Sequence, residues 1–291
     1  MGIREKTEKT LMIIFGLSVL MISLTESAGC EPGIADHQWI PIPAGLLVIS
    51  ENDGHPGSLK PAFRARRTPG SQGGDRWQTV LRVRAFKIDR YEVTNRSYRK
   101  FVDSTNRTPS AYASDSRFNR PENPVVGVSW EDGRDYCRWV GGRLPTEAEW
   151  LKAGRGKDNR QTPWGSDNNF INYNVLDRAN INPVVSLKLY DWYGSKFAAD
   201  GHRFTAPVGG FPKGVSPYGV HDLLGNVWEW VDRHLPNPML NYKRRIPPRI
   251  KPLKGGSWMS LANYLNLGTR RWRDQSLRQD STVGFRCAQD P

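Results

Sequence analysis

A glycine-rich turn near the C-terminus carries the side chains best suited to line a reactive pocket. The segment KGGSW, residues 254–258, places Ser257 and Trp258 after two glycines, and a backbone without Cβ atoms can approach a ligand closely. A hydroxyl and an indole at this turn can form a recognition groove. The structural alternative is that Ser257 satisfies the turn and Trp258 packs in the core. The next residues, including Ser260 and Leu265, are chemically plain, so the pocket is either catalytic or has lost its chemistry.

The chain has few other reactive constellations. No Ser-His-Asp ordering and no pair of carboxylates stands out. No two of the five histidines lie close together in the sequence. We therefore expect surface or capping roles, rather than metal binding through the imidazole, for the histidines at 37, 55, 202, 221 and 234.

Three cysteines occur, Cys30, Cys137 and Cys287. If Cys30 carries a lipid, an even pair remains, and an exported, oxidising compartment favours a disulfide between Cys137 and Cys287. Such a bond would tie the middle of the chain to its C-terminus and stabilise the fold by about 4–5 kcal/mol in the chain-entropy model. Two cysteines without a nearby histidine make a poor zinc site.

The first 29 residues predict a secretory signal of the lipoprotein type. Basic residues precede an uncharged run, residues 11–24, which is too short to span a bilayer comfortably but suits the central region of a signal peptide. The run leads to Ser-Ala-Gly-Cys at residues 27–30. Small residues before a cysteine resemble a bacterial lipobox, although Ser27 replaces its usual leucine. Ordinary cleavage near Ala28 or Gly29, or retention as an uncleaved anchor, are the alternatives.

If residues 27–30 are a lipobox, the protein is exported to the periplasm or the outer cell surface. It is then lipid-anchored to a membrane through Cys30. Residues 30–38 would form a polar tether and residues 39–291 the folded domain.

The formal net charge is +13, from 42 basic and 29 acidic residues. A basic chain ordinarily indicates nucleic acid, but an exported protein rarely meets it, so we expect no nucleic-acid partner. Anionic lipid headgroups or an acidic protein fit better, and a generally basic solvated surface is the alternative.

Composition and periodicity predict a mixed, loop-rich fold. The 28 glycines, 21 prolines and 11 tryptophans indicate a fold held together by aromatic side chains. Strand patterns cover residues 39–49 and 80–94. Thr94, Ser129 and Thr146 are plausible helix N-caps, and Thr146 with Glu149 forms a capping box. Beyond Gly154 we expect mostly short strands and loops, hence α+β because long βαβ alternation is missing.

Several motifs occur in an order that resembles the formylglycine-generating enzyme, or sulfatase-modifying factor, superfamily. The resemblance runs from residue 39 to residue 290 and implies a C-type-lectin-like fold with much irregular structure. It also pairs Cys137 with Cys287. The superfamily includes copper-dependent oxidases, iron enzymes of sulfur chemistry and members without known chemistry, so membership alone does not decide function. The motifs are DRYEVTNRSYRKFV (89–102), RLPTEAEW (143–150), GNVWEW (225–230), KGGSW (254–258) and VGFRCAQD (283–290).

The resemblance bears directly on the copper chemistry. In the copper oxidases, the positions that match Ser260 and Leu265 are both cysteine, and a thiolate pair suits Cu(I) as a soft ligand set. A hydroxyl is a poor Cu(I) ligand and an isobutyl group is none. We therefore expect no copper, and the resemblance excludes copper-dependent formylglycine generation. The histidine-rich motif of the iron members is not found here, so we expect no iron.

The superfamily also implies calcium, which takes backbone carbonyls and side-chain oxygens because it is a hard cation. The second site falls on Asp222, Gly225, Val227 and Glu229, with the two acids supplying carboxylates. A buried carboxylate paired with an arginine is the alternative for Glu229.

The first calcium site implied by the resemblance involves two segments. Asn172 and Asp200 would supply side-chain oxygens, and Tyr173 and His202 would supply carbonyls. Asn174 is the alternative to Asn172.

We predict a non-catalytic scaffold or accessory subunit of a membrane-associated envelope complex, with other proteins as partners. The chain has an export signal and the motifs of the family fold, but it lacks the two cysteines that would bind copper. The basic, proline-rich loops 50–75 and 231–253 are expected contact surfaces, beside a groove lined by Ser257, Trp258 and Arg271. The alternative is an enzyme of the same superfamily with copper-independent chemistry. Ligand binding, for example of a glycan, is a third class that rests on fold analogy alone.

Overall fold

The computed structural model describes residues 37–50, 78–165, 176–182, 200–232, 235, 247–262 and 265–291. The predicted signal, Cys30 and most of the tether lie outside these residues, as do most of the loops 50–75 and 231–253. Within the described ranges, no helix combines the length and apolarity needed to cross a membrane.

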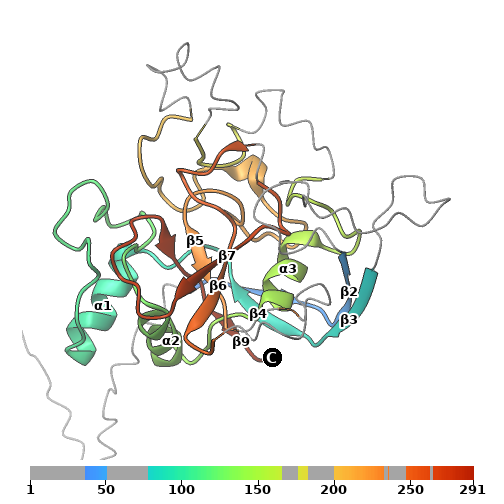
Figure 1. The fold of residues 1–291 in the computed structure, drawn as a ribbon, viewed down its shortest axis with the longest axis horizontal. Helices are drawn as coiled ribbons and strands as arrows, with labels where there is room; N and C mark the ends of the chain where they lie inside the picture. The colour runs from blue at the N-terminus through green and yellow to red at the C-terminus, as the bar shows by residue number, and fades with distance from the viewer. Residues whose placement is uncertain are drawn as a thin grey trace, which may run out of the picture. The chain divides into compact units, whose positions relative to one another are not determined.

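The three helices begin at the predicted caps. Helix α1 covers Asn95–Thr105, α2 covers Trp130–Trp139 and α3 covers Glu147–Arg155. Each cap hydroxyl accepts the amide three residues ahead, which satisfies a donor that has no partner within the helix. The capping box of α3 is confirmed, and α2 has one as well. Figure 1 shows α1 and α2 next to each other and α3 apart from them.

The strands form three small sheets (Figure 1). One is the antiparallel set β1-β4-β9, made of Trp39–Ile42, Phe86–Asp89 and Ala288–Gln289. A second is the antiparallel ribbon of β2 (Gly45–Ser50) and β3 (Gln78–Val83). The third has the order β7-β6-β5-β8 and contains Arg270–Asp274, Ile250–Lys254, Trp228–Trp230 and Val283–Gly284, with β5 and β8 parallel. A short 3-10 helix, η2, covers Pro212–Gly214.

The strand pattern over 39–49 resolves into β1 and β2 rather than one strand. Pro43 follows β1 directly, and a proline has no amide proton to donate to a sheet. The α+β class is confirmed: the described residues contain three short α-helices and three small sheets.

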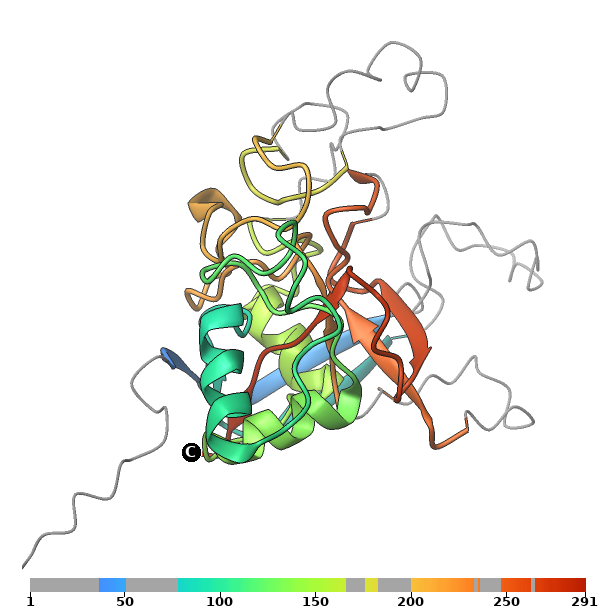
Figure 2. The same cartoon turned by 90° about the vertical axis from the view of Figure 1, so that its left-hand side faces the viewer.

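Aromatic side chains fill much of the core, as the composition predicts. Tyr136 of α2 packs edge-on against Phe101 of α1 and against Phe285, with ring centroids 5.5 and 5.4 Å apart. Trp150 of α3 is fully buried in a second cluster with Phe86 and Ile88 of β4. Figure 2 shows the face of the domain on which α1 and α2 lie.

The predicted disulfide is confirmed. Cys137 in α2 bonds to Cys287, their Cα atoms lie 5.5 Å apart, and both residues are fully buried. The amide of Cys287 donates to Asp89 Oδ2, and its carbonyl accepts from the amide of Asp89. The bond therefore ties α2 to the C-terminal segment that pairs with β4.

Candidate functional site

The Gly-Gly-Ser-Trp turn follows directly after β6. Gly255 and Gly256 both adopt left-handed conformations, with φ of 97° and 83°. A Cβ on Gly255 would lie 2.9 Å from the carbonyl oxygen of Leu223, and one on Gly256 would lie 2.4 Å from Leu265 Cδ2. Both glycines are therefore required by conformation and by space.

The side chains of Ser260 and Leu265 converge beside Gly256, since both approach the position that its Cβ would occupy. These are the two positions for which the resemblance implies cysteine in copper oxidases. Here Ser260 Oγ accepts a hydrogen bond from the amide of Ser257 at 2.9 Å. Leu265 is 1% exposed and packs with Ile181 in a small apolar cluster. One position caps the turn and the other fills a hydrophobic space.

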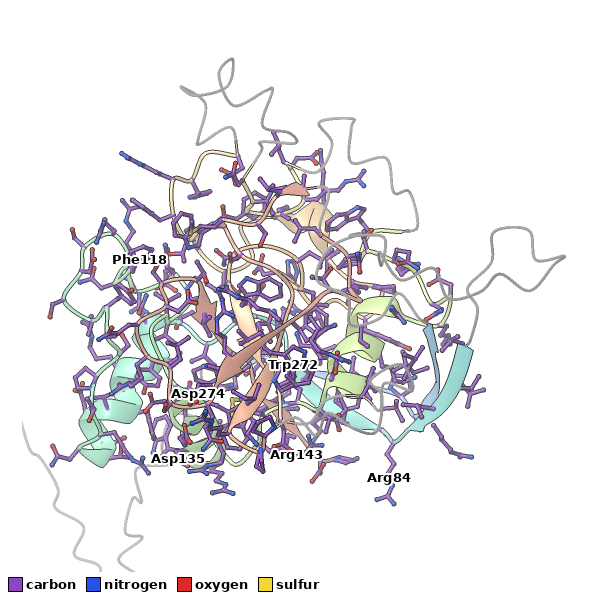
Figure 3. The ribbon with its side chains drawn as sticks, in the orientation of Figure 1. Arg84, Phe118, Asp135, Arg143, Trp272 and Asp274 are labelled. Atoms are coloured by element: carbon purple, nitrogen blue, oxygen red, sulfur yellow. A yellow bond between two sulfur atoms is a disulfide. The ribbon has the colours of Figure 1, made fainter. Side chains whose placement is uncertain are left out.

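Ser257 and Trp258 both make contacts within the fold, and Trp258 is half-buried. Ser257 is buried, and its hydroxyl accepts from the amide of Met259. Trp258 donates its indole N–H to the carbonyl of Ser281 at 3.2 Å, and its ring packs edge-on against Phe204 with centroids 5.4 Å apart. Phe118, labelled in Figure 3, completes this aromatic cluster.

Arg271 lies on β7 near the same turn. Its guanidinium approaches Asp280 at 3.7 Å, the residue before the Ser281 that accepts from Trp258, and it lies over the ring of Trp228. Trp272 and Asp274, labelled in Figure 3, continue the strand beyond it. Arg271 and Trp258 thus contact neighbouring residues, Asp280 and Ser281.

Glu229 of β5 has the arginine partner that was left open as the alternative to calcium. Its carboxylate is fully buried and accepts two hydrogen bonds from Arg286, at 2.7 and 2.8 Å. The indole N–H of Trp150 donates a third bond at 2.8 Å. Three strong donors therefore surround the two oxygens, which leaves little room for Glu229 to coordinate a cation.

Asp222 lies in the same region, in a left-handed conformation with φ of 57°. Its Oδ2 accepts the amide of Gly209 at 2.6 Å, and burial raises the pKa of this carboxyl to about 6. Glu92 is a further buried carboxyl that the sequence analysis missed. It accepts from Asn226 Nδ2 at 2.6 Å and from the amide of Val227. Burial, Asp222 and Glu229 all raise the pKa of Glu92 well above its ordinary value.

These three carboxyls, which we call the acid-rich cluster (Glu92, Asp222 and Glu229), share Arg286 as their cation. Full ionisation would leave more buried negative than positive charge. The excess of buried negative charge around Asp222 is compatible with a cation, whereas the oxygens of Glu229 already accept hydrogen bonds from Arg286 and Trp150.

The first predicted calcium site is only partly described, because Asn172 and Tyr173 lie outside the described residues. Asp200 is described, and its carboxylate accepts the amides of Ile181 and His202 at 3.1 and 3.0 Å. The neighbouring Asn180 is 1% exposed, and its Oδ1 is buried without a hydrogen-bond partner.

An orphaned buried oxygen is a ligand that a hard cation can use. The structure therefore adds Asn180, not considered from the sequence, because the amide of the next residue, Ile181, bonds to the Asp200 carboxylate. Its sequence signal is an asparagine between the apolar residues Ala179 and Ile181, which marks a buried position.

The described histidines have other contacts. His37 bonds to Asp89 at 2.7 Å and to Tyr136 at 3.0 Å. The pKa of His221 is lowered by burial, Arg90 and Arg286. Among the described residues, no three or more His, Cys, Asp or Glu side chains form a group suited to a metal ion. His55 and His234 lie outside those residues.

Comparison with known proteins agrees with this architecture. The family model described as "Sulfatase-modifying factor enzyme 1-like domain" matches residues 37–291. The formylglycine-generating enzyme of Mus musculus is 30% identical over 319 residues, covering 91% of this chain and 78% of that protein. The inactive C-alpha-formylglycine-generating enzyme 2 of Bos taurus is 37% identical over 177 residues, covering 57% of this chain and 50% of that protein.

A solved structure shows the same fold. The structure of PvdO from Pseudomonas aeruginosa matches with a TM-score of 0.63 at 22% identity, covering 87% of this chain and 94% of that chain. The family match spans nearly all of the described domain and confirms the resemblance of the motifs. The chain belongs to the sulfatase-modifying factor enzyme 1-like family.

Proposed function

We propose that this protein is a non-catalytic, exported, lipid-anchored scaffold or accessory subunit of a membrane-associated envelope complex. The observation that carries the proposal is the pair beside Gly256. Ser260 is committed to capping the turn, and Leu265 is committed to an apolar cluster. Neither supplies the soft thiolate that Cu(I) chemistry requires.

The aromatic contacts of Trp258 support the same proposal. Its indole N–H bonds to Ser281, and its ring packs against Phe204 and Phe118. We infer that Trp258 packs within the fold and does not take part in a reaction. The family contains both enzymes and a relative named as inactive. A member that keeps the fold without the enzymatic activity therefore has a precedent. The Ser-Ala-Gly-Cys boundary supports membrane anchoring through Cys30.

Calcium belongs to the proposal as a structural cation. Asp200 and the orphaned oxygen of Asn180 would hold one ion, and Asp222 would contribute to a second. A bound cation would supply the positive charge that the acid-rich cluster lacks.

Copper titration tests the non-catalytic part directly. The purified full chain is titrated with Cu(I) against a competing chelator and assayed for oxidation of a cysteine-containing sulfatase peptide. We expect no tight copper and no oxidation above the rate without protein. The double substitution Ser260→Cys with Leu265→Cys is the matched control, because it keeps residues 255–258 of the Gly-Gly-Ser-Trp turn, and it should gain Cu(I) affinity. Stoichiometric, chelator-resistant copper or peptide oxidation by the unmodified protein would overturn the proposal.

Capture from membranes tests the scaffold part separately. The tagged full chain is purified from detergent-solubilised membranes, and its N-terminus is identified by mass spectrometry. We expect an acylated Cys30 and a partner in stoichiometric amount, with both lost on Cys30→Ser if the anchor brings the complex together. Recovery of a lone monomer would reject the scaffold role while leaving the copper result untouched.

A further inference from the structure

A cavity of about 270 Å³ lies between α1 and the segment that follows it, and none of its lining residues belongs to the Gly-Gly-Ser-Trp turn or the acid-rich cluster. One wall is a stripe of α1 that includes Arg99, Val102 and Asp103. The opposite wall belongs to the segment 109–119 and includes Ser110 and Asn119. Neither the proposed scaffold role nor the calcium sites use these residues.

Hydrogen bonds from side chains to the backbone hold the walls in place. Asn95 Nδ2 donates to the carbonyls of Phe118 and Arg120, at 2.7 and 3.0 Å, and so joins the far segment to the start of α1. Asn119 Nδ2 donates to the carbonyl of Ala113 at 3.1 Å, and Arg278 donates to the carbonyl of Pro109 at 2.6 Å. The cavity is therefore pre-organised, which lowers the entropy lost on binding.

Two opposite charges stand on the α1 wall without neutralising each other. Arg99 and Asp103 are four residues apart on one helix, a spacing at which ion pairs often form. They form no ion pair with each other, and within the described part of the chain neither has another ionic partner. Arg96, one turn earlier, is by contrast paired with Glu122. The arrangement of Arg99 before Asp103 is the less favourable order for a helical pair, so both charges are available to a ligand.

The opposite wall offers a hydroxyl and apolar surface. Ser110 is 8% exposed, and its hydroxyl has no hydrogen-bond partner among the described residues. Its carbonyl, not its side chain, accepts the amide of Ala113. Val102, Pro109 and Ala113 supply apolar contacts. A nearly buried, unpartnered hydroxyl is satisfied when a ligand or water bonds to it.

We propose that this cavity binds a free α-amino acid or a zwitterion of similar size. Arg99 would hold the carboxylate, because a guanidinium forms strong charge-assisted bonds to that group. Asp103 would hold the ammonium, Ser110 would add a hydrogen bond, and the apolar patch would receive a short side chain. The volume lies below the usual range of about 300–1,000 Å³ for pockets that take drug-sized ligands, which suits a ligand of this size.

The test measures binding of free amino acids to the full-length protein by calorimetry, using amino acids with small apolar side chains. Each is compared with its N-acetyl derivative, which lacks the ammonium, and with its amide, which lacks the carboxylate. The zwitterion should bind at least about tenfold more tightly than either derivative, since each lost charge removes a charge-assisted bond. Arg99→Gln should remove the preference over the amide only. Asp103→Asn should remove the preference over the N-acetyl derivative only.

Arg96→Gln is the matched control, because it deletes an arginine of the same helix that does not line the cavity, and it should leave affinity unchanged. Circular dichroism of each variant verifies that α1 is intact. The proposal is overturned if no amino acid binds the wild-type protein at millimolar concentration. It is also overturned if the derivatives bind as tightly as the zwitterion, or if Arg96→Gln weakens binding as much as Arg99→Gln.

Discussion

Two buried groups of charges lie next to each other where strands β5 and β6 pair, and their charge balance is opposite. The acid-rich cluster has three carboxyls for Arg286. The second group, which we call the base-rich cluster, contains Glu147 with Arg270 at 2.7 Å and Lys254 at 3.3 Å. Glu147, like Glu229, is fully buried.

The two clusters are structural neighbours. Glu229 of β5 pairs in register with Lys254 of β6. The indole N–H of Trp150 donates to Glu229, and its ring lies 5.6 Å from Lys254 Nζ. Trp150 therefore contacts both clusters. The effect of a substitution in one cluster can be compared with the effect of the equivalent substitution in the other.

Desolvation acts on both clusters, but the neighbouring charges decide the outcome. Burial alone would raise the pKa of Glu147, yet Lys254 and Arg270 hold it below its ordinary value. In the acid-rich cluster, burial and neighbouring carboxylates act in the same direction on Glu92, and its pKa rises. A cluster that compensates its own charge is structural, whereas a cluster with an excess of buried acid needs a proton or a cation.

Removing one arginine from each cluster should give the largest difference in the free energy of unfolding between the two clusters. Arg286→Leu leaves three buried carboxyls without their cation, and breaking a buried pair in this way costs about 3–5 kcal/mol. Arg270→Leu leaves Glu147 with Lys254, so we expect a smaller loss, about 1–3 kcal/mol. Urea denaturation of both variants measures the difference. Equal losses would show that the charge balance has no influence.

The pH dependence of stability should have opposite signs in the two clusters. In calcium-free buffer, Asp222 binds its proton more tightly when folded, so stability falls as pH rises from about 4 towards its folded pKa of about 6. Glu147 has a lowered folded pKa, so its stabilisation is present above the ordinary pKa of 4.5 and is lost as pH falls through the folded value. Thermal unfolding between pH 3 and 8 measures both effects.

Asp222→Asn and Glu147→Gln assign these limbs of the profile. The asparagine should reduce the fall of stability between about pH 4 and 6, and the part that remains belongs to Glu92, whose pKa is also raised. The glutamine should flatten the loss at the acid end. A profile in which neither substitution alters its own limb would contradict the assignment.

If calcium occupies the proposed sites, it should stabilise the protein by mass action, because those sites exist only in the native state. At 100 times the dissociation constant the gain is about 2.7 kcal/mol. Chelation should therefore lower the melting temperature, and the sensitivity to chelation should weaken in Asp200→Asn and Asp222→Asn. Glu147→Gln is the control and should retain it. Identical melting of chelated and calcium-loaded protein would reject calcium.

The smallest expected effect is the change in stability caused by Asp222→Asn. It distinguishes a role of Asp222 in calcium binding from a response to protons alone. Asp222→Asn keeps an acceptor for the amide of Gly209, and asparagine tolerates a left-handed backbone. At pH 7.5 in chelator, the loss of one excess charge should stabilise the protein by about 1 kcal/mol, because a buried unpaired charge is unfavourable. In excess calcium the same substitution should be destabilising. An unchanged sign in the two buffers would show that Asp222 responds to protons alone.

Several features were determined by the sequence itself. The caps at Thr94, Ser129 and Thr146 place the helix starts, because capping depends on residues only three positions apart. The order of the family motifs predicts the fold, and the two cysteines left after Cys30 predict the disulfide. The poor match of Ser260 and Leu265 to Cu(I) also follows from residue type alone.

Only the tertiary structure decided which distant groups meet. Arg286 reaches Glu229 from 57 residues away, and Glu92 joins Asn226 from 134 residues away. Ile181, the residue after Asn180, bonds to Asp200 from 19 residues away, and Arg99 and Ser110 line one cavity. Local spacing carries no information about such pairs, because their distances depend on how the helices and sheets pack. Charge balance, solvent exclusion and pKa depend on those distances, and so does what each buried carboxylate can bind.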